Sequence, residues 1–252
     1  MSPRHTIVIP AYNEEQRLDS TLSALAIYLE QTPLADVILV DDGSTDNTRN
    51  LLANWTSNRA RCCLITIHHS GKAVAVLTGL NRAKGDYIIF MDADLAVPLG
   101  EVPRLLKALS EGAEVVLGTR EGTDSIRNNE SRFRHVRGRL FNLFVSLVAI
   151  RGISDTQCGF KGFTKKASTQ ISKYMHVHSG HNPAPSGPSV TAFDVEILFI
   201  AKKLNFAIRE LSVEWNNVEG SKVDSIRDPI RMAKSVLAIR INSWLGRYEP
   251  KI

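Results

Sequence analysis

The feature that most constrains this fold is a regular alternation of short apolar, β-branched runs with segments of helical periodicity. The expected strands are Thr6–Pro10, Val37–Val40, Leu64–His68, Tyr87–Met91 and Val115–Gly118. The expected helices that separate them are Gln16–Leu29, Asp46–Trp55, Ala73–Ala83 and Pro103–Leu109. Because strands joined by whole helices need crossover connections, we predict an α/β fold with a mainly parallel central sheet and helices on both faces.

The pattern changes beyond Arg120. A basic segment leads into an apolar helix candidate, Leu140–Ile150, and residues 179–189 form a turn-rich stretch with three prolines. The remaining expected elements are a helix at Phe193–Leu204, a strand at Ile208–Trp215 and a long amphipathic basic helix at Asp228–Leu245. Neither an internal repeat nor a linker interrupts the chain. We therefore expect one domain, residues 1–252, in which residues 121–252 are elaborations that end in the amphipathic helix.

Positive charge is unevenly distributed. The formal net charge is +5, and the basic residues cluster between Arg127 and Arg151 and again between Arg227 and Arg247. Such clusters favour a phosphate-bearing partner or an anionic membrane surface, although solvated basic helix faces explain the charge equally well. We expect no nucleic-acid partner.

Cysteine usage and hydropathy indicate the setting. The three cysteines, Cys62, Cys63 and Cys158, have no metal-ligand spacing, which fits a reducing cytoplasmic environment. The sequence contains neither a signal-peptide pattern nor a run of roughly 18 uncharged apolar residues, the length that a spanning helix requires. We therefore expect any membrane contact to be peripheral.

Paired acidic residues follow two of the expected strands. Asp41 and Asp42 close the second strand, and Asp92 and Asp94 follow the apolar strand Tyr87–Met91. Neighbouring carboxylates repel each other unless a cation or a donor-rich ligand is close. Residues two apart in an extended chain point to the same side, so Asp92 and Asp94 can converge on one hard divalent cation. The alternative for Asp42 is a turn or helix cap.

Two further strand ends carry residues suited to a nucleotide. The segment Pro10–Glu15 supplies a proline, an aromatic ring and carboxylates, although Asn and Glu at such a place can also cap a helix. Gly71 and Lys72 begin the helix Ala73–Ala83, where backbone donors and an ammonium suit a phosphate. The spacing of a Walker A loop is absent, so we infer no nucleotide hydrolase.

These motifs together resemble a known family. The runs Ile9–Glu15, Val40–Asp46 and Asp92–Leu95 are similar to the signature of inverting glycosyltransferases with the GT-A fold. The resemblance continues through Asp155–Lys161 and Gly220–Lys222, in the manner of dolichyl-phosphate glucosyltransferases and bacterial polyprenyl-phosphate glycosyltransferases. It covers nearly the whole chain.

The resemblance implies a nucleotide-sugar donor and a divalent metal. It places the base and ribose near Pro10, Tyr12, Glu14, Asp41 and Asp42, and Lys72 near the donor. It also implies that Asp92 and Asp94 hold Mg²⁺ or Mn²⁺ on the donor diphosphate. The related mannosyl-phosphate synthases usually have glutamine two residues after the second acid, where this chain has Ala96. That departure favours glucose from UDP-glucose.

The remaining site candidates concern the acceptor, which the resemblance implies is a polyprenyl phosphate. Arg132, Arg137 and Arg139 precede an apolar run, and Lys222 lies in a glycine-containing loop, so these cations are expected to bind the acceptor phosphate. The alternative is a core helix with a solvated basic edge. The candidates for catalysis are Asp155, which would orient the acceptor or act as base, together with Asp94 and Asp194.

Two other functions remain open on the sequence. One keeps the donor site but transfers the sugar to a soluble hydroxyl or phosphorylated acceptor. The other is a nucleotide-sugar-binding module without turnover, against which the intact acids Asp92 and Asp94 argue.

Overall fold

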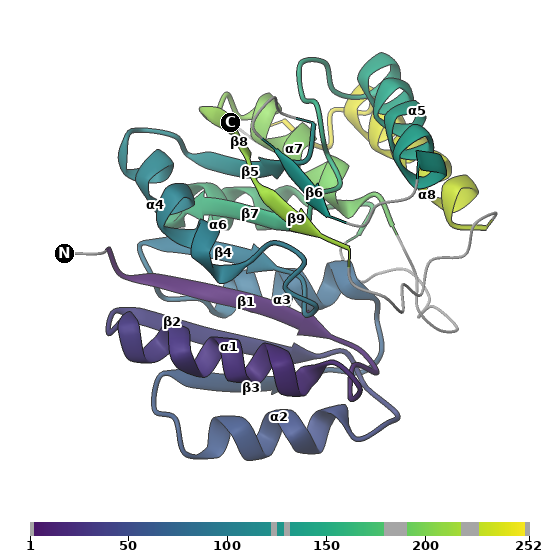
Figure 1. Cartoon of the computed structure of the whole chain (residues 1–252). Coiled ribbons are helices and arrows are strands. Elements are labelled where there is room, and N and C mark those ends of the chain that lie inside the picture. The colour runs from purple at the N-terminus through teal and green to yellow at the C-terminus, as the bar shows by residue number, and fades with distance from the viewer. Residues whose placement is uncertain (1–2, 122–124, 129–131, 179–190, 218–226, 250–252) are drawn as a thin grey trace.

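A seven-stranded sheet runs through the molecule, with helices on both of its faces (Figure 1). The computed structural model describes residues 3–121, 125–128, 132–178, 191–217 and 227–249, without the side chains of 127, 128, 132–137, 227 and 228. The strand order is β3-β2-β1-β4-β7-β5-β8. All of these strands are parallel except β7, which is antiparallel to both of its neighbours, β4 and β5. The prediction of a mainly parallel α/β sheet is confirmed.

The first half of the chain follows the predicted alternation closely. Its elements are β1 (His5–Ala11), α1 (Leu18–Gln31), β2 (Ala35–Asp41), α2 (Thr48–Ser57), β3 (Cys62–Thr66), α3 (Lys72–Arg82), β4 (Tyr87–Met91), η1 (Leu99–Glu101), α4 (Val102–Ser110) and β5 (Val115–Thr119). Helix α1 shows why the periodicity succeeds, because Leu18, Leu22, Leu25 and Leu29 recur at helical spacing and are all buried. It begins two residues later than predicted because residues 14–17 form a turn.

The second half departs further from the prediction. Its elements are β6 (Ile126–Asn128), α5 (Arg132–Val148), β7 (Phe160–Thr164), α6 (Lys165–Tyr174), α7 (Phe193–Lys203), β8 (Ile208–Ser212), β9 (Glu214–Asn216) and α8 (Arg227–Trp244). The predicted strand Ile208–Trp215 is wrong as one strand, because β8 joins the large sheet while β9 pairs with β6 in a separate two-stranded sheet. The sequence reading missed β6, β7 and α6. The turn-rich stretch 179–189 lies outside the described residues.

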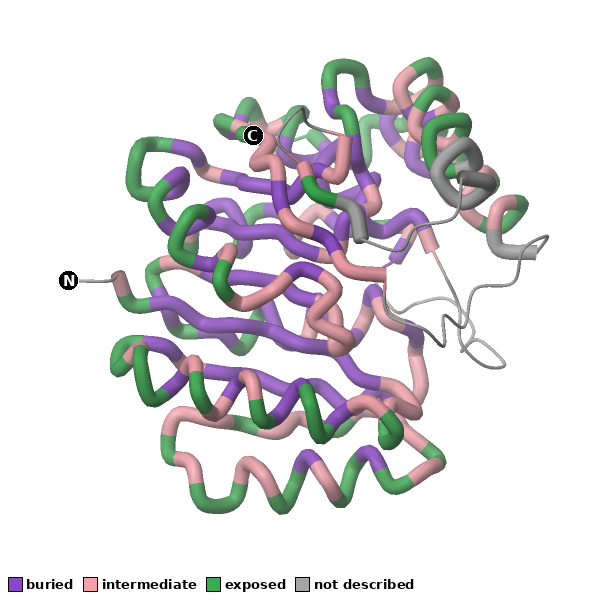
Figure 2. Tube along the Cα trace, in the orientation of Figure 1, coloured by how far each residue is buried: buried purple, intermediate pink, exposed green. Residues whose placement is uncertain are grey.

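Two apolar layers cover the faces of the sheet. One contains α3, α6 and α7, with side chains such as Val76, Ile171 and Ile197, and the other contains α1 and α4. The central strands are buried on both sides, as the purple trace through the middle of Figure 2 shows. Strands buried on both faces read as continuous apolar runs, which explains why β4 was predicted with its observed bounds.

Candidate active site

The reversed strand β7 determines which segments meet at one edge of the sheet. The parallel strands β1, β2, β4 and β5 all end at this edge, whereas β7 begins there, since Phe160 pairs with Met91, the last residue of β4. The segment that leads into β7, residues 155–159, therefore lies beside the loops that follow β4 and β5. In α/β sheets, ligands bind in crevices at the carboxyl ends of the strands.

Asp41 and Asp42 are buried at the end of β2 and bonded within the protein. The Asp41 carboxylate accepts hydrogen bonds from the Ser44 amide at 3.1 Å and from Arg49 Nε at 3.0 Å. Asp42 accepts from the amides of Ser70 and Gly71 at 2.8 and 2.9 Å and lies 2.9 Å from His69 Nδ1. Burial raises the pKa of Asp42 above its usual value despite these bonds. Both acids thus fix the loops after β2 and β3.

The loop after β1 carries the other predicted nucleotide contacts. Pro10 is buried inside β1 opposite Val40. The half-buried ring of Tyr12 stacks on His69, with centroids 4.0 Å apart and planes tilted by 14°. Glu14 binds Arg17 through its carboxylate and donates its amide to Thr48 Oγ1 at 2.7 Å. The stacked pair is a flat surface next to Asp42, which suits a planar base.

The loop with Asp92 and Asp94 is tightly held. The Ala93 carbonyl accepts a hydrogen bond from Thr21 Oγ1 at 2.6 Å. The Ala96 carbonyl accepts one from the Asn216 amide at 2.7 Å. Asp94 Oδ1 accepts from the Ala96 amide at 3.1 Å. Leu95 has a φ of 46°, a left-handed conformation that an L-residue adopts only when its surroundings hold it there. The two carboxylates are therefore set in place before any ligand arrives.

Lys72 lies against this acidic pair. Its Nζ is 2.6 Å from Asp92 Oδ1, and 40% of its side chain is exposed. Burial alone would lower the pKa of Lys72, but the carboxylates of Asp92, Asp194 and Asp94 outweigh burial and raise it above its usual value. Lys72 thus stays protonated, and its ammonium group lies directly on one oxygen of the Asp92 carboxylate.

The acids suit a hard divalent cation. Burial and the neighbouring charge of Asp92 raise the pKa of Asp94. A bound cation would relieve that repulsion. Among the described residues, no group of three or more His, Cys, Asp or Glu side chains could form a closed metal cage. A metal on Asp92 and Asp94 would therefore need further oxygen ligands, which a diphosphate provides.

Gly159 is required for the position of Asp92. A Cβ built on Gly159 would lie 2.0 Å from Asp92 Oδ2, and the Asp92 amide donates to the Gly159 carbonyl at 3.1 Å. Only a residue without a side chain allows this approach. The sequence reading included Gly159 in a family motif but gave it no role.

Asp155 binds an arginine that the sequence reading missed. Arg120 Nε and Nη2 donate to its two oxygens at 2.6 and 2.9 Å, and the Arg120 and Gln157 amides donate as well, each at 3.1 Å. Burial would raise the pKa of Asp155, but these donors hold it below its usual value. The Arg120 guanidinium lies 5.5 Å from the centre of the Trp215 ring. The position of Arg120 directly after the predicted strand β5 is the sequence signal that could have revealed its role.

Asp194 is paired with a second residue that the sequence reading missed. Lys161 is fully buried on β7, and its Nζ donates to Asp194 Oδ1 at 2.5 Å and to the Cys158 carbonyl at 2.6 Å. Burial raises the pKa of Asp194, whereas Lys161 and Lys72 act in the opposite direction. Asp194 thus interacts electrostatically with two lysines, and Lys72 in turn contacts Asp92.

A model of one enzyme family matches most of the chain. The matched residues are 6–171, and the family is described as glycosyl transferase family 2. The chain belongs to glycosyl transferase family 2. The match begins in β1 and ends in α6, so it contains the Asp92–Asp94 loop, Lys72 and Asp155.

Curated relatives of this family 2 transferase extend the match to nearly the whole chain. The dolichyl-phosphate beta-glucosyltransferase of Dictyostelium discoideum is 32% identical over 98% of this chain and 76% of its own length. The enzymes of the same name from Homo sapiens and Saccharomyces cerevisiae are each 31% identical over 97% of this chain, and over 77% and 76% of their own lengths.

Solved structures support the fold of the transferase. Glucosyl-3-phosphoglycerate synthase from Mycobacterium tuberculosis, crystallised with Mn²⁺, UDP-glucose and phosphoglyceric acid, superposes with a TM-score of 0.66. The identity is 19%, and the match covers 99% of this chain and 81% of that one. Mannosyl-3-phosphoglycerate synthase from Rubrobacter xylanophilus gives 0.62 at 18% identity over 97% and 76% of the two chains. At such identities the likeness concerns the fold, and the predicted GT-A fold is confirmed.

Most of the predicted acceptor residues of the transferase have side chains that the structure does not describe. Lys222 and the side chains of Arg132 and Arg137 lie outside the described residues. Arg139 is described, and it is exposed on α5. One turn further along that helix, Asn142 Oδ1 accepts from Thr156 Oγ1 at 3.1 Å, which links α5 to the segment that contains Asp155.

Glu196 and the nearby histidines have a structural role. The fully buried Glu196 accepts from the amides of His176, Val177 and His178 at 2.8–3.1 Å, and it also contacts His178 Nδ1 and the Tyr248 hydroxyl. Burial would raise the pKa of Glu196, but these donors lower it.

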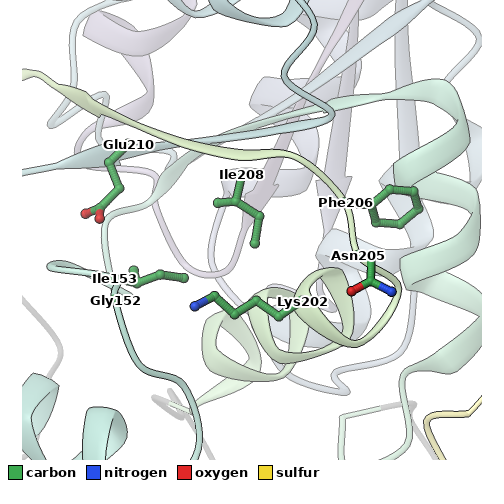
Figure 3. A pocket seen from close by; sticks show the side chains of 7 residues that line it. All are labelled: Gly152, Ile153, Lys202, Asn205, Phe206, Ile208 and Glu210. Carbon is green, nitrogen blue, oxygen red and sulfur yellow. The ribbon is translucent and has the colours of Figure 1, made fainter.

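A cavity of about 500 Å³ lies elsewhere on the transferase (Figure 3). Its lining includes Lys202 near the end of α7, Asn205, and Ile208 at the start of β8. Ile208 pairs with Val115, the first residue of β5, so the cavity lies toward the amino end of these strands. It is therefore separate from the acidic edge, and we assign no substrate to it.

Proposed function

We propose that this chain transfers glucose from UDP-glucose to a polyprenyl phosphate, with inversion at the anomeric carbon. The single observation that carries the proposal is the acidic loop, in which Asp92 and Asp94 adjoin Lys72 at the carboxyl edge of the sheet. The names of the curated relatives support glucose as the sugar and a dolichyl-type phosphate as the acceptor. We place the reaction at the cytoplasmic side of a membrane.

The donor would lie across the ends of β1, β2 and β4. The Tyr12–His69 pair offers a face for the uracil ring, while Asp41 and Asp42 hold the loops around it. Lys72 and the amino end of α3 would face the diphosphate, since Lys72 is the first residue of that helix and remains charged. In this arrangement Tyr12 and Asp42 lie at the nucleoside end of the donor, and Lys72 lies at its diphosphate end.

Asp92 and Asp94 would hold Mg²⁺ or Mn²⁺ on the donor diphosphate. Such an ion supplies charge neutralisation for the departing nucleoside diphosphate. Gly159 keeps the Asp92 carboxylate in position, and the bonds at Ala93 and Ala96 fix the loop. The preference of these oxygens for hard cations supports magnesium or manganese over softer metals.

The acceptor needs little help from a base. A phosphate monoester is ionised near neutral pH, so its oxygen can attack the anomeric carbon as the bond to the UDP oxygen breaks. One displacement converts the α-linked glucose of the donor into a β-linked product. We assign Asp155 to orienting Arg120, whose guanidinium would bind the acceptor phosphate, because this carboxylate is fully engaged and its lowered pKa makes it a weak base.

A product assay tests the proposal. The purified chain with Mn²⁺, UDP-glucose and a polyprenyl phosphate is expected to form lipid-linked glucose and UDP. GDP-mannose in place of UDP-glucose is expected to give far less product, and chelation of the metal should stop turnover. Efficient transfer to a soluble acceptor such as phosphoglyceric acid, with none to the prenyl phosphate, would contradict the acceptor assignment. Binding of UDP-glucose without any product would contradict the catalytic assignment.

A further inference from the structure

Exposed apolar side chains gather on two neighbouring helices. Eight of the eleven large hydrophobic side chains that are exposed among the described residues lie on α5, on α8 or directly after α8. They are Leu140, Leu143, Leu147, Ile230, Leu237, Ile241, Trp244 and Leu245. The two helices contact each other and lie side by side at one end of the molecule (Figure 1). An apolar patch of this kind usually marks an interaction surface.

The exposed residues form stripes opposite the buried side of each helix. On α5, Leu140, Leu143 and Leu147 recur at intervals of three and four residues, while Val145 is fully buried. On α8, Leu237, Ile241 and Trp244 recur in the same way, while Val236 and Ile239 are fully buried. Each helix thus has an inner face that packs on the protein and an outer apolar face.

The charge around these stripes selects the partner. Arg139, Arg231, Lys234 and Arg247 are exposed on or beside the helices. The sequence of α5 contains no acidic residue, and residues 229–248 of the C-terminal segment contain none either. A second copy of the chain would bring two cationic faces together, which is unfavourable. An anionic bilayer surface instead accepts both the apolar side chains and the cations.

The two helices are firmly attached to the rest of the protein. The fully buried Tyr248, just after α8, donates its hydroxyl to Glu196 at 2.8 Å, and His176 Nε2 lies 2.8 Å from the Arg247 carbonyl. Asn142 on α5 accepts from Thr156, the neighbour of Asp155. The outer faces therefore have a fixed orientation relative to Asp155 and Arg120.

We propose that the outer faces of α5 and α8 form one docking surface for an anionic lipid bilayer. The surface lies in the plane of the membrane, with the apolar stripes among the acyl chains and the arginines and lysines at the head groups. None of the described helices is long and apolar enough to cross a membrane. The inference deepens the proposed function, because docking by α5 would bring Arg120 close to the phosphate of a membrane-bound acceptor.

Vesicle flotation of the whole chain tests the surface. The vesicles contain phosphatidylcholine with or without phosphatidylglycerol, and they contain neither prenyl phosphate nor nucleotide sugar. The wild-type chain is expected to float with the anionic vesicles, more weakly at high salt, and to bind neutral vesicles poorly. Because no reaction is involved, failure here is distinguishable from failure of the proposed glucosyl transfer.

Paired variants separate the two contributions. Leu147→Gln with Trp244→Gln, at sites that are 69% and 73% exposed, should weaken binding by more than about tenfold. Arg231→Gln with Lys234→Gln should weaken binding to anionic vesicles by about tenfold. The matched controls are Ile27→Gln, 57% exposed on α1, and Lys107→Gln on α4, both expected to bind like wild type. Unchanged melting temperatures show that each variant is folded.

Three results would overturn the proposal. The first is a wild-type chain that does not float with anionic vesicles. The second is a helix variant that binds as well as its control. The third is a concentration-dependent dimer, seen by light scattering, that the Leu147→Gln and Trp244→Gln changes abolish while vesicle binding is unaffected.

Discussion

At the scale of single residues, Gly159 offers a direct test of how Asp92 is positioned. Gly159→Ala would place a methyl group against the Asp92 carboxylate, where only 2.0 Å is available. We expect turnover to fall by at least about tenfold, because displacing a group at a reacting centre by about 1 Å is enough for such a loss. Steady-state kinetics with UDP-glucose and varied Mn²⁺ measure the effect.

The matched control is Gly138→Ala. A Cβ at Gly138, on α5, meets no atom within 4 Å. Alanine there is expected to leave turnover unchanged and to stabilise the helix by up to about 1 kcal/mol. If both alanine variants had wild-type kinetics and metal dependence, the role assigned to Gly159 would be wrong.

Asp155 gives a prediction about pH. Its pKa is lowered in the folded protein by Arg120, so its contribution to stability is present above the unfolded pKa of about 3.9 and is lost as pH falls through the folded value. Asp155→Asn should reduce the free energy of unfolding at neutral pH by about 2–3 kcal/mol. It should also flatten the loss of stability below about pH 4. Urea unfolding across acidic pH measures both effects, and a wild-type acid profile in the variant would contradict the assignment.

Residue types at strand ends were the part of the site that the sequence could predict. Asp92 and Asp94 follow an apolar run, and Lys72 begins a helix, so sequence position alone brings them to one edge. Lys161 and Arg120 were missed for physical reasons. A lysine within an apolar strand becomes meaningful only when its partner, Asp194, is known, and that partner is 33 residues away. The pairing of Arg120 with Asp155 spans 35 residues.

At the scale of elements, Glu196 links three segments. It joins α7 to residues 176–178 and to Tyr248 beyond α8. Glu196→Gln removes a buried charge that several donors surround, so we expect a loss of about 3–5 kcal/mol in the free energy of unfolding. Tyr248→Phe removes one hydrogen bond and should cost only about 1 kcal/mol. Thermal denaturation compares the two, and equal melting temperatures would contradict the central role of Glu196.

Two failures of the sequence prediction, at β7 and at the boundary between β8 and β9, have physical causes. β7 is short and contains a lysine and a glycine, Lys161 and Gly162, so its apolar pattern is weak. Its antiparallel direction depends on contacts with β4 and β5 and has no local signal. The prediction of one strand at Ile208–Trp215 was wrong for a similar reason, since this extended segment divides between two sheets at Val213 without a local signal.

At the scale of the whole molecule, we infer that residues 1–252 form one domain around the central sheet. Elements from both halves of the chain contribute to the same edge, with Lys72 and Asp92 from the first half and Asp155 and Asp194 from the second. The two halves interlock at β7, which lies between β4 and β5. We propose that the elements after β5 supply the acceptor side and the surface of α5 and α8.

The most direct test of the central claim is calorimetric titration of UDP-glucose into the chain with and without Mn²⁺. The comparison uses the wild type and an Asp92→Asn, Asp94→Asn double variant. We predict that Mn²⁺ tightens donor binding to the wild type by more than about tenfold, that is by more than about 1.4 kcal/mol, and that the variant loses this gain. An equal gain from Mn²⁺ in the folded variant would contradict the account.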